Sequence, residues 1–116
     1  MSNTNNVVVT GGRDYPDSSM VWAVLTSIKM DKLYVGDAKG ADLFAKECAE
    51  YHGIPVEVFK ADWTKHGKAA GPIRNATMLD AAGKDAIVVA FLGGKGTANC
   101  VNEALRRNMI ILKVIE

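Results

Sequence analysis

The sequence predicts an α/β fold, because short apolar runs alternate along the chain with segments whose apolar residues recur at helical spacing. The apolar runs are rich in valine and isoleucine, which are typical of buried strands. Strict alternation of strands and helices implies a parallel sheet covered on both faces, with right-handed crossovers. We therefore expect a single Rossmann-like, three-layer domain with a five-stranded parallel sheet over residues 1–116.

The first half of the chain contains three predicted strands and two predicted helices. Residues 7–10 form a strand that ends at a glycine pair, and Asp17 or Ser18 can cap the helix that follows. Residues 33–35 form the next strand, and the helix after it is stopped by Gly53. The run 55–59 alternates and begins with proline, which suits a strand near a sheet edge.

The second half begins with residues 61–71, which lack periodicity and are predicted to form a long, charged loop. Pro72 is placed as the first residue of a helix that ends near Gly83. Residues 86–92 are the most apolar run and are expected to form the central strand. Thr97 is predicted to cap the last helix, and residues 110–115 form the last strand.

Composition excludes several classes of protein. The net charge of +1 predicts no strong attraction to nucleic acid or membranes, and no apolar run is long enough to span a bilayer. Because no signal peptide opens the chain, we expect a cytoplasmic protein, with residues 1–6 flexible. Cys48 and Cys100 belong to no metal-binding motif, so we expect neither a disulfide nor a metal site.

Glycine clusters and charged residues gather where the predicted strands end. In parallel α/β sheets, ligands bind beyond the carboxyl ends of the strands. The segment 93–97, Gly-Gly-Lys-Gly-Thr, joins a strand to a helix and can offer free amides to a phosphate or carboxylate, although a tight turn that binds nothing is the alternative. It lacks the spacing of a Walker loop and of a dinucleotide-binding motif, so no NAD or other cofactor is expected.

Five motifs together resemble the SLOG superfamily, which includes the Lonely Guy phosphoribohydrolases and the DprA proteins. Within it, the chain is most similar to the YspA/YpsA-related SLOG domains of phages and bacteria. The motifs occur in the expected order across residues 10–97: Thr-Gly-Gly-Arg-Asp (10–14), Gly-Asp-Ala-Lys-Gly-Ala-Asp (36–42), Ala-Asp-Trp (61–63), Gly-Lys-Ala-Ala-Gly-Pro-Ile-Arg-Asn (67–75) with Met78, and Gly-Gly-Lys-Gly-Thr (93–97).

The resemblance implies a site for a nucleoside phosphate. Arg74 with Met78 matches the arginine segment of the Lonely Guy enzymes, with Asn75 in place of lysine. The position of their glutamate falls on Cys100, and a thiol does not readily replace that carboxylate. Glu103, one turn further along, can reach the site only with an unusual side-chain direction.

The candidate site residues lie on the strand ends. Arg74, Asp37 and Asp42 are the catalytic candidates, with Asp14 and Asp62 as alternative acids or bases between which spacing does not decide. Trp63 is either a stacking platform, a lid anchor or, as is more common, a core residue. The predicted ligand-binding residues are Gly11, Gly12, Arg13, Asp14, Gly36, Asp37, Gly40, Asp42, Trp63, Gly71, Arg74, Asn75, Gly93, Gly94, Lys95, Gly96 and Thr97.

Three functions are compatible with these residues. The first is binding of a nucleotide-derived small molecule, such as a nucleoside phosphate or an ADP-ribose-like ligand, by a sensor or sequestering protein. The second is hydrolysis of an N-glycosidic bond in such a ligand. DNA binding ranks a distant third because the charge is near neutral. The predicted helices carry more apolar side chains than a five-stranded sheet needs to cover it, among them Met20, Trp22 and Met30. These side chains suggest a homodimer.

Overall fold

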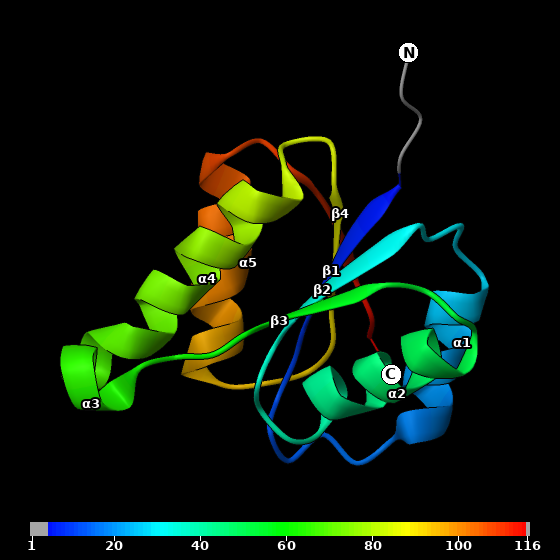
Figure 1. Ribbon diagram of the computed structural model, residues 1–116, viewed down its shortest axis with the longest axis horizontal. Helices are drawn as coiled ribbons and strands as arrows, with labels where there is room; N and C mark the ends of the chain where they lie inside the picture. The colour runs from blue at the N-terminus through cyan, green and yellow to red at the C-terminus, as the bar shows by residue number, and fades with distance from the viewer. Residues whose placement is uncertain (1–4, 116) are drawn as a thin grey trace.

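The computed structural model describes residues 5–115 and contains a five-stranded, fully parallel sheet with the strand order β3-β2-β1-β4-β5 (Figure 1). The predicted fold class is therefore confirmed. The elements are β1 (Asn6–Thr10), α1 (Ser18–Thr26), β2 (Lys32–Gly36), α2 (Ala41–Tyr51), β3 (Val56–Phe59), α3 (Trp63–His66), the 3₁₀ turn η1 (Gly67–Ala69), α4 (Ala70–Ala82), β4 (Ile87–Ala90), α5 (Lys95–Arg106) and β5 (Ile110–Lys113).

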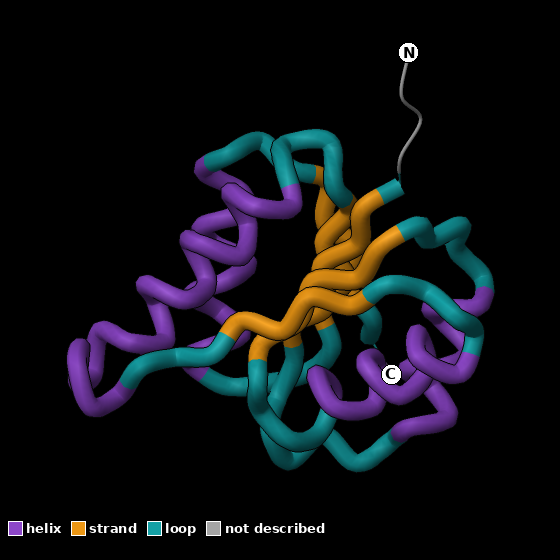
Figure 2. Tube along the Cα trace, viewed as in Figure 1, coloured by secondary structure: helices purple, strands orange, loops and turns teal. Residues whose placement is uncertain are grey.

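The sheet is the middle of three layers. Helices α1 and α2 lie on one face, and α4 and α5 lie on the other (Figure 2). Side chains of successive strand residues point to opposite faces, so β1 contributes to two separate cores. Val7 and Val9 pack under α1 and α2, whereas Val8 packs under α4 and α5, and all three are fully buried.

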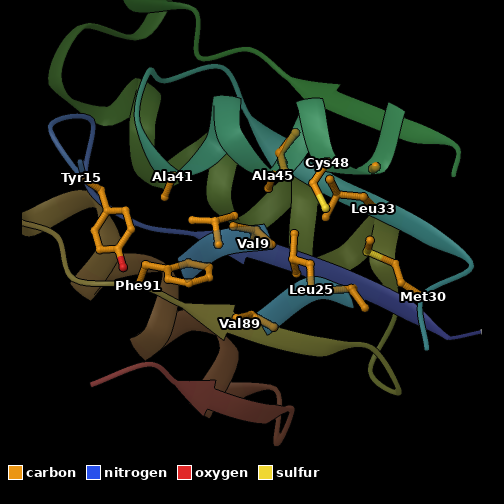
Figure 3. Packing of buried hydrophobic residues seen from close by; sticks show 14 residues of the cluster. Val9, Tyr15, Leu25, Met30, Leu33, Ala41, Ala45, Cys48, Val89 and Phe91 are labelled. Carbon is orange, nitrogen blue, oxygen red and sulfur yellow. The ribbon is translucent and has the colours of Figure 1, made fainter. Parts of the chain in front are cut away.

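The core beneath α1 and α2 reaches the carboxyl edge of the sheet. Figure 3 shows Leu25 of α1 and Ala45 of α2 packed against Val9, with Tyr15 and Phe91 beside them. The rings of Tyr15 and Phe91 lie 5.3 Å apart and are tilted, an arrangement that aromatic pairs favour. This contact anchors the loop after β1 to the end of β4.

The strand order places a topological switch point beside β1. The chain leaves β1 for β2 on one side and later returns to β4 on the other side. The connections therefore depart to opposite faces of the sheet at the carboxyl ends of β1 and β4, which leaves a crevice between them. The loops after β1, β2 and β4 meet along this edge (Figure 1).

Two predictions about the second half of the chain are wrong. The central strand is β1, because β4 has only β5 between it and the sheet edge. The segment 61–71 is not a loop: it forms α3, η1 and the start of α4, so that Pro72 is the third residue of its helix. Asp62 starts α3 by accepting a hydrogen bond from the amide of Lys65, at 3.0 Å.

Two predictions about chain and helix ends also need correction. Thr97 does not cap α5, because the helix begins at Lys95 with Gly94 as its N-cap residue and has no side-chain cap. Asn6 belongs to β1, and the amide of Asn5 donates to Asp31 at 2.8 Å, so the expected flexibility does not extend to these two residues. Residues 1–4 lie outside the described part of the chain.

The predicted cap of α1 is confirmed, because Asp17 accepts a hydrogen bond from the amide of Met20 at 2.9 Å.

The side chains that suggested a dimer are used within the fold. Met30 is buried, and Met20 and Trp22 pack against the core beneath α1 and α2. They therefore give no support for an interface. Among the helices described for residues 5–115, none combines the length and apolar character that crossing a bilayer requires.

Gly40 illustrates how tightly the loops at the carboxyl edge approach one another. Its φ of +73° is a conformation that favours glycine, and a Cβ atom there would collide with the carbonyl oxygens of Gly12 and Arg13. Gly53 has a similar φ of +70°, but no atom lies within 4 Å of the place its Cβ would occupy.

We predict that Gly40→Ala lowers the free energy of unfolding by about 3 kcal/mol, because backbone strain and overpacking add. The matched control Gly53→Ala has the strain alone and should cost about 1 kcal/mol. Urea unfolding of the two variants measures the difference. Equal losses in both variants would contradict the close approach of the two loops.

Candidate functional site

A cavity of about 1050 Å³ opens at the carboxyl edge of the sheet. Its walls come from the ends of β1 and β2, from the loops that follow β1, β2 and β4, and from residues of α2, α3, η1, α4 and α5. Of the predicted ligand-binding residues, only Gly40 does not line it. The residues that do are Gly11, Gly12, Arg13, Asp14, Gly36, Asp37, Asp42, Trp63, Gly71, Arg74, Asn75, Gly93, Gly94, Lys95, Gly96 and Thr97.

Arg74 is held in place by three partners. Its Nη1 donates to Oδ1 of Asp37 at 3.0 Å and to the carbonyl oxygen of Phe59 at 3.3 Å. Its Nε donates to Oδ1 of Asn75 at 2.9 Å. Because the side chain is only 14% exposed, these contacts fix the guanidinium group at the cavity wall. A fixed guanidinium is well suited to bind phosphate or carboxylate oxygens.

Asn75 connects the two helices whose first turns flank the cavity. Its Nδ2 donates to the carbonyl oxygen of Gly96 at 3.2 Å and to Oδ1 of Asn99 at 3.0 Å, both in α5. The side chain is buried, and its Oδ1 accepts from Arg74. Asn75 thus links the guanidinium group of Arg74 to the first turn of α5, and we regard it as a positioning residue.

Asp42 is a buried carboxyl group in the cavity wall, with 6% of the residue exposed. Its Oδ2 accepts from the amide of Ala38 at 3.3 Å. Burial raises the pKa of Asp42 to about 7, and this effect outweighs the opposing attraction of Arg74. A carboxyl group with such a pKa can hold or release a proton near neutral pH.

Gly36 provides the space in which Arg74 and Asp42 come together. A Cβ atom at position 36 would collide with Nη1 of Arg74 and would lie 2.8 Å from Oδ2 of Asp42. Any side chain here would therefore displace the charged pair. Asp37, the next residue, is partly exposed and completes the cluster through its ion pair with Arg74.

The glycine-rich segment after β4 forms another part of the cavity wall. Lys95, Gly96 and Thr97 are the first residues of α5 and line the cavity, and no side chain caps this helix end. The amides of a first helical turn are donors without helical partners at the positive end of the dipole. Anions bind readily at such a position. Arg13 and Lys95 are exposed and add positive charge to the same cavity.

Cys100 does not supply a substitute for the glutamate of the Lonely Guy enzymes. The thiol is fully buried, and burial raises its pKa to about 11, while a hydrogen bond with Thr10 has a smaller, opposite effect. It is therefore a neutral thiol at physiological pH. Glu103 does not reach the cavity either, because its carboxylate pairs with Arg107 at 2.9 Å and with Arg106 at 3.1 Å.

Trp63 is exposed, so the expectation that it is a core residue is wrong. It is the first residue of α3, and 59% of it is accessible. The physical reason is its place in the fold. Helix α3 packs against η1 and α4 at one end of the molecule, away from both cores (Figure 1).

Some lining residues were not among the predicted site residues. Thr10, Lys68 and Asn99 bring a hydroxyl, an ammonium and an amide group to the cavity wall. Lys68 lies within one of the motifs and could have been selected on its charge. Asn99 has no comparable signal, because its contact with Asn75 depends on how α4 packs against α5. Asp62, one of the alternative carboxylates, is occupied as the cap of α3.

Taken together, the fold and the cavity define an α/β protein with a candidate anion-binding site at the switch point of a parallel sheet. Among residues 5–115 there is no group of three or more metal-ligating side chains. The cavity contains groups of both signs. Its arginines and helix-start amides attract anions, and the carboxyl groups of Asp37 and Asp42 can accept hydrogen bonds from hydroxyl groups.

Comparison with known proteins identifies the family. The model of the YspA, cpYpsA-related SLOG family matches residues 5–66, more than half of the chain, and the protein belongs to this family. It is similar to the Gene 61 protein of Mycobacterium phage D29. The two sequences are 33% identical over an alignment of 117 positions, which covers 91% of this chain and 93% of the phage protein. The resemblance inferred from the motifs is confirmed, and membership of the family indicates a nucleotide-related function.

The buried carboxyl group gives a prediction about stability. Because the pKa of Asp42 is raised from 3.8 to about 7 on folding, the unfolded chain releases this proton at lower pH than the folded chain does. Asp42 therefore makes the free energy of unfolding fall as pH rises from about 4 to about 7, after which its effect is constant.

We expect Asp42→Asn to stabilise the protein at pH 8 by about 1–3 kcal/mol and to have little effect at pH 4. The amide can still accept from Ala38, so the helix start is preserved. Urea unfolding between pH 4 and pH 8 measures this, with Asp80→Asn as the control, since Asp80 is exposed at the surface and its pKa is lowered by its hydrogen bond with Arg107. An unchanged pH profile in the Asp42 variant would contradict the raised pKa.

Proposed function

We propose that this protein binds a nucleotide or nucleotide-derived ligand, a nucleoside phosphate or an ADP-ribose-like molecule, at the carboxyl edge of its sheet, and acts as a sensor or sequestering protein. The observation that carries the proposal is that Arg74 and the uncapped first turn of α5 line the same cavity. Two independent sources of positive potential then face the same space, which favours a phosphate group.

The carboxyl groups support a sugar phosphate over a simple inorganic anion. Asp37 and Asp42 lie beside Arg74, so an anion bound there has acceptors close to it. Carboxylates accept hydrogen bonds from hydroxyl groups but repel a second anionic group. A ribose next to a phosphate satisfies both requirements. The family's nucleotide-related character agrees with this choice.

We expect isothermal titration calorimetry to detect binding of at least one of AMP, ADP and ADP-ribose to the wild-type protein. Replacement of Arg74 by lysine keeps the charge but removes the planar fork, and we expect it to weaken binding by about 10-fold or more, since hydrogen bonds to charged groups contribute about 1.5–3 kcal/mol. Arg106→Lys is the matched control, because Arg106 is exposed, pairs with Glu103 and lies outside the cavity.

Two results would count against this function. Absence of binding by any of the three ligands at millimolar concentration would exclude the proposed ligand class. Equal affinity in the Arg74 and Arg106 variants would place the binding site elsewhere. Thermal unfolding of each variant identifies a loss of affinity that is caused by unfolding.

The second candidate function is hydrolysis of the N-glycosidic bond of the same ligand. The observation that favours it is the carboxyl group of Asp42, which lies in the cavity wall next to Arg74 and has a pKa of about 7. Such a group can donate a proton to a departing base or accept one from water. Asp37 is the second carboxyl group available in the same cluster.

If the protein is a hydrolase, chromatography will show adenine released from AMP by the wild type. We then expect Asp42→Asn to lower the rate by about 100-fold or more, which is a typical contribution of a general acid or base. Unchanged AMP after prolonged incubation at high protein concentration would exclude this reaction. The binding function would be unaffected by that result.

A further inference from the structure

Trp63 lines the cavity from the first turn of α3 and is 59% exposed. The other tryptophan, Trp22, is partly buried and packs against the core and the ring of Tyr51, at a centroid distance of 5.4 Å. Trp63 contributes to neither core cluster, and more than half of it is accessible. A large aromatic side chain left exposed within a cavity is a surface on which another flat group can stack.

The indole is supported on the side of α4. A Cβ atom at Gly71 would lie 3.4 Å from Cη2 of Trp63, an ordinary contact distance, so the ring packs beside the first turn of this helix. Gly71 itself is buried and also lines the cavity. The ring thus has a backbone support, while the accessible remainder faces solvent and the cavity.

The contact between the indole and Gly71 lies about one helical turn from the charged cluster. Gly71 precedes Asn75 by one turn of α4, a rise of about 5–6 Å along the helix axis. Arg74 and Asn75 mark the part of the cavity that we assign to phosphate and ribose. One helical turn is comparable with the width of a sugar ring, so a group attached to the far side of the ribose would reach Trp63.

From this arrangement we propose that the accessible surface of Trp63 is a nucleobase subsite, so that the ligand is a free nucleotide with its base and not a sugar phosphate alone. This inference rests on the proposed binding function and specifies the ligand further. Stacking on tryptophan tolerates any base, because every base has a π-face. The cavity, at about 1050 Å³, also exceeds what ribose 5-phosphate would fill.

The first test compares AMP with ribose 5-phosphate by calorimetry in the wild type and in Trp63→Ala. We expect the substitution to weaken AMP binding by about 5- to 150-fold, the range that corresponds to a stacking contribution of about 1–3 kcal/mol. Binding of ribose 5-phosphate should be unchanged. Because Trp63 is exposed, we expect the variant to keep its thermal stability, and Trp63→Phe should restore most of the affinity for AMP.

The second test uses fluorescence. In Trp22→Phe the only tryptophan is Trp63, and we expect AMP to quench its emission whereas ribose 5-phosphate leaves it unchanged. In Trp63→Phe the remaining Trp22 reports from outside the cavity and should respond to neither ligand. A five-nucleotide adenine oligonucleotide serves as a third ligand and separates a free nucleotide from the end of a nucleic-acid strand.

The outcomes distinguish this inference from the proposed function. If Trp63→Ala binds both AMP and ribose 5-phosphate as the wild type does, the base subsite is wrong but the phosphate site stands. An equal loss for both ligands gives Trp63 a structural role and also overturns the inference. Tighter binding of the oligonucleotide than of AMP would overturn the free nucleotide as the ligand. If the wild type binds none of the ligands, both proposals fail together.

Discussion

The candidate site depends on the direct contact of three loop backbones at the carboxyl edge of the sheet. The amide of Gly12 donates to the carbonyl oxygen of Leu92 at 2.9 Å, which joins the loop after β1 to the loop after β4. The carbonyl oxygen of Gly12 accepts from the amide of Ala41 at 3.3 Å, which joins the same loop to the start of α2. Side chains at Gly40 or Gly93 would collide with the backbone of this loop, so the glycines are what permit the approach. These backbone hydrogen bonds join three parts of the cavity wall to one another, which favours a site that needs little ordering of those loops when a ligand binds.

The cluster of Arg74, Asp37 and Asp42 both costs and gains free energy in the folded protein. Burial of the Asp42 carboxyl group next to Arg74 costs free energy whenever the group is ionised, and the raised pKa measures that cost. Arg74 lowers the cost only in part, because its Nη1 is shared between Asp37 and the carbonyl oxygen of Phe59. An anionic ligand on Arg74 would weaken the attraction between the guanidinium group and both carboxyl groups. In the proposed binding mode, ligand binding and proton uptake by Asp42 would therefore be coupled, because protonation of Asp42 removes a negative charge from the space where the phosphate would bind.

Alternation of apolar runs and helical periodicity was sufficient to predict all five strands and the parallel sheet, because both signals are local. The glycine-rich strand ends likewise predicted most of the cavity wall, since parallel strands bring their carboxyl ends to one edge. Helix α3 is not predicted, although Asp62 is a recognisable helix cap, because residues 61–71 lack the apolar periodicity that indicates a helix. Other features had no local signal. The burial of Asp42 and the contact of Asn75 with Asn99 depend on groups brought together only by the packing of helices and strands.

The positions of Cys100 and Glu103 are the reason that we propose binding ahead of hydrolysis. Cleavage of an N-glycosidic bond needs a group that supports positive charge developing on the sugar, and a carboxylate does this where a neutral thiol does not. Cys100 occupies the helix position at which the related enzymes carry glutamate, and its thiol is fully buried with a pKa of about 11. Glu103, the nearest carboxylate on α5, is held by Arg107 and Arg106. Burial disfavours the ionised form of Asp42, and Asp37 pairs with Arg74 at 3.0 Å, so neither carboxyl group of this cluster offers an uncompensated negative charge to the sugar. A carboxyl group that burial neutralises and a carboxylate that an arginine compensates are poor supports for an oxocarbenium-like sugar, and for this reason we propose binding of a nucleotide ahead of its cleavage.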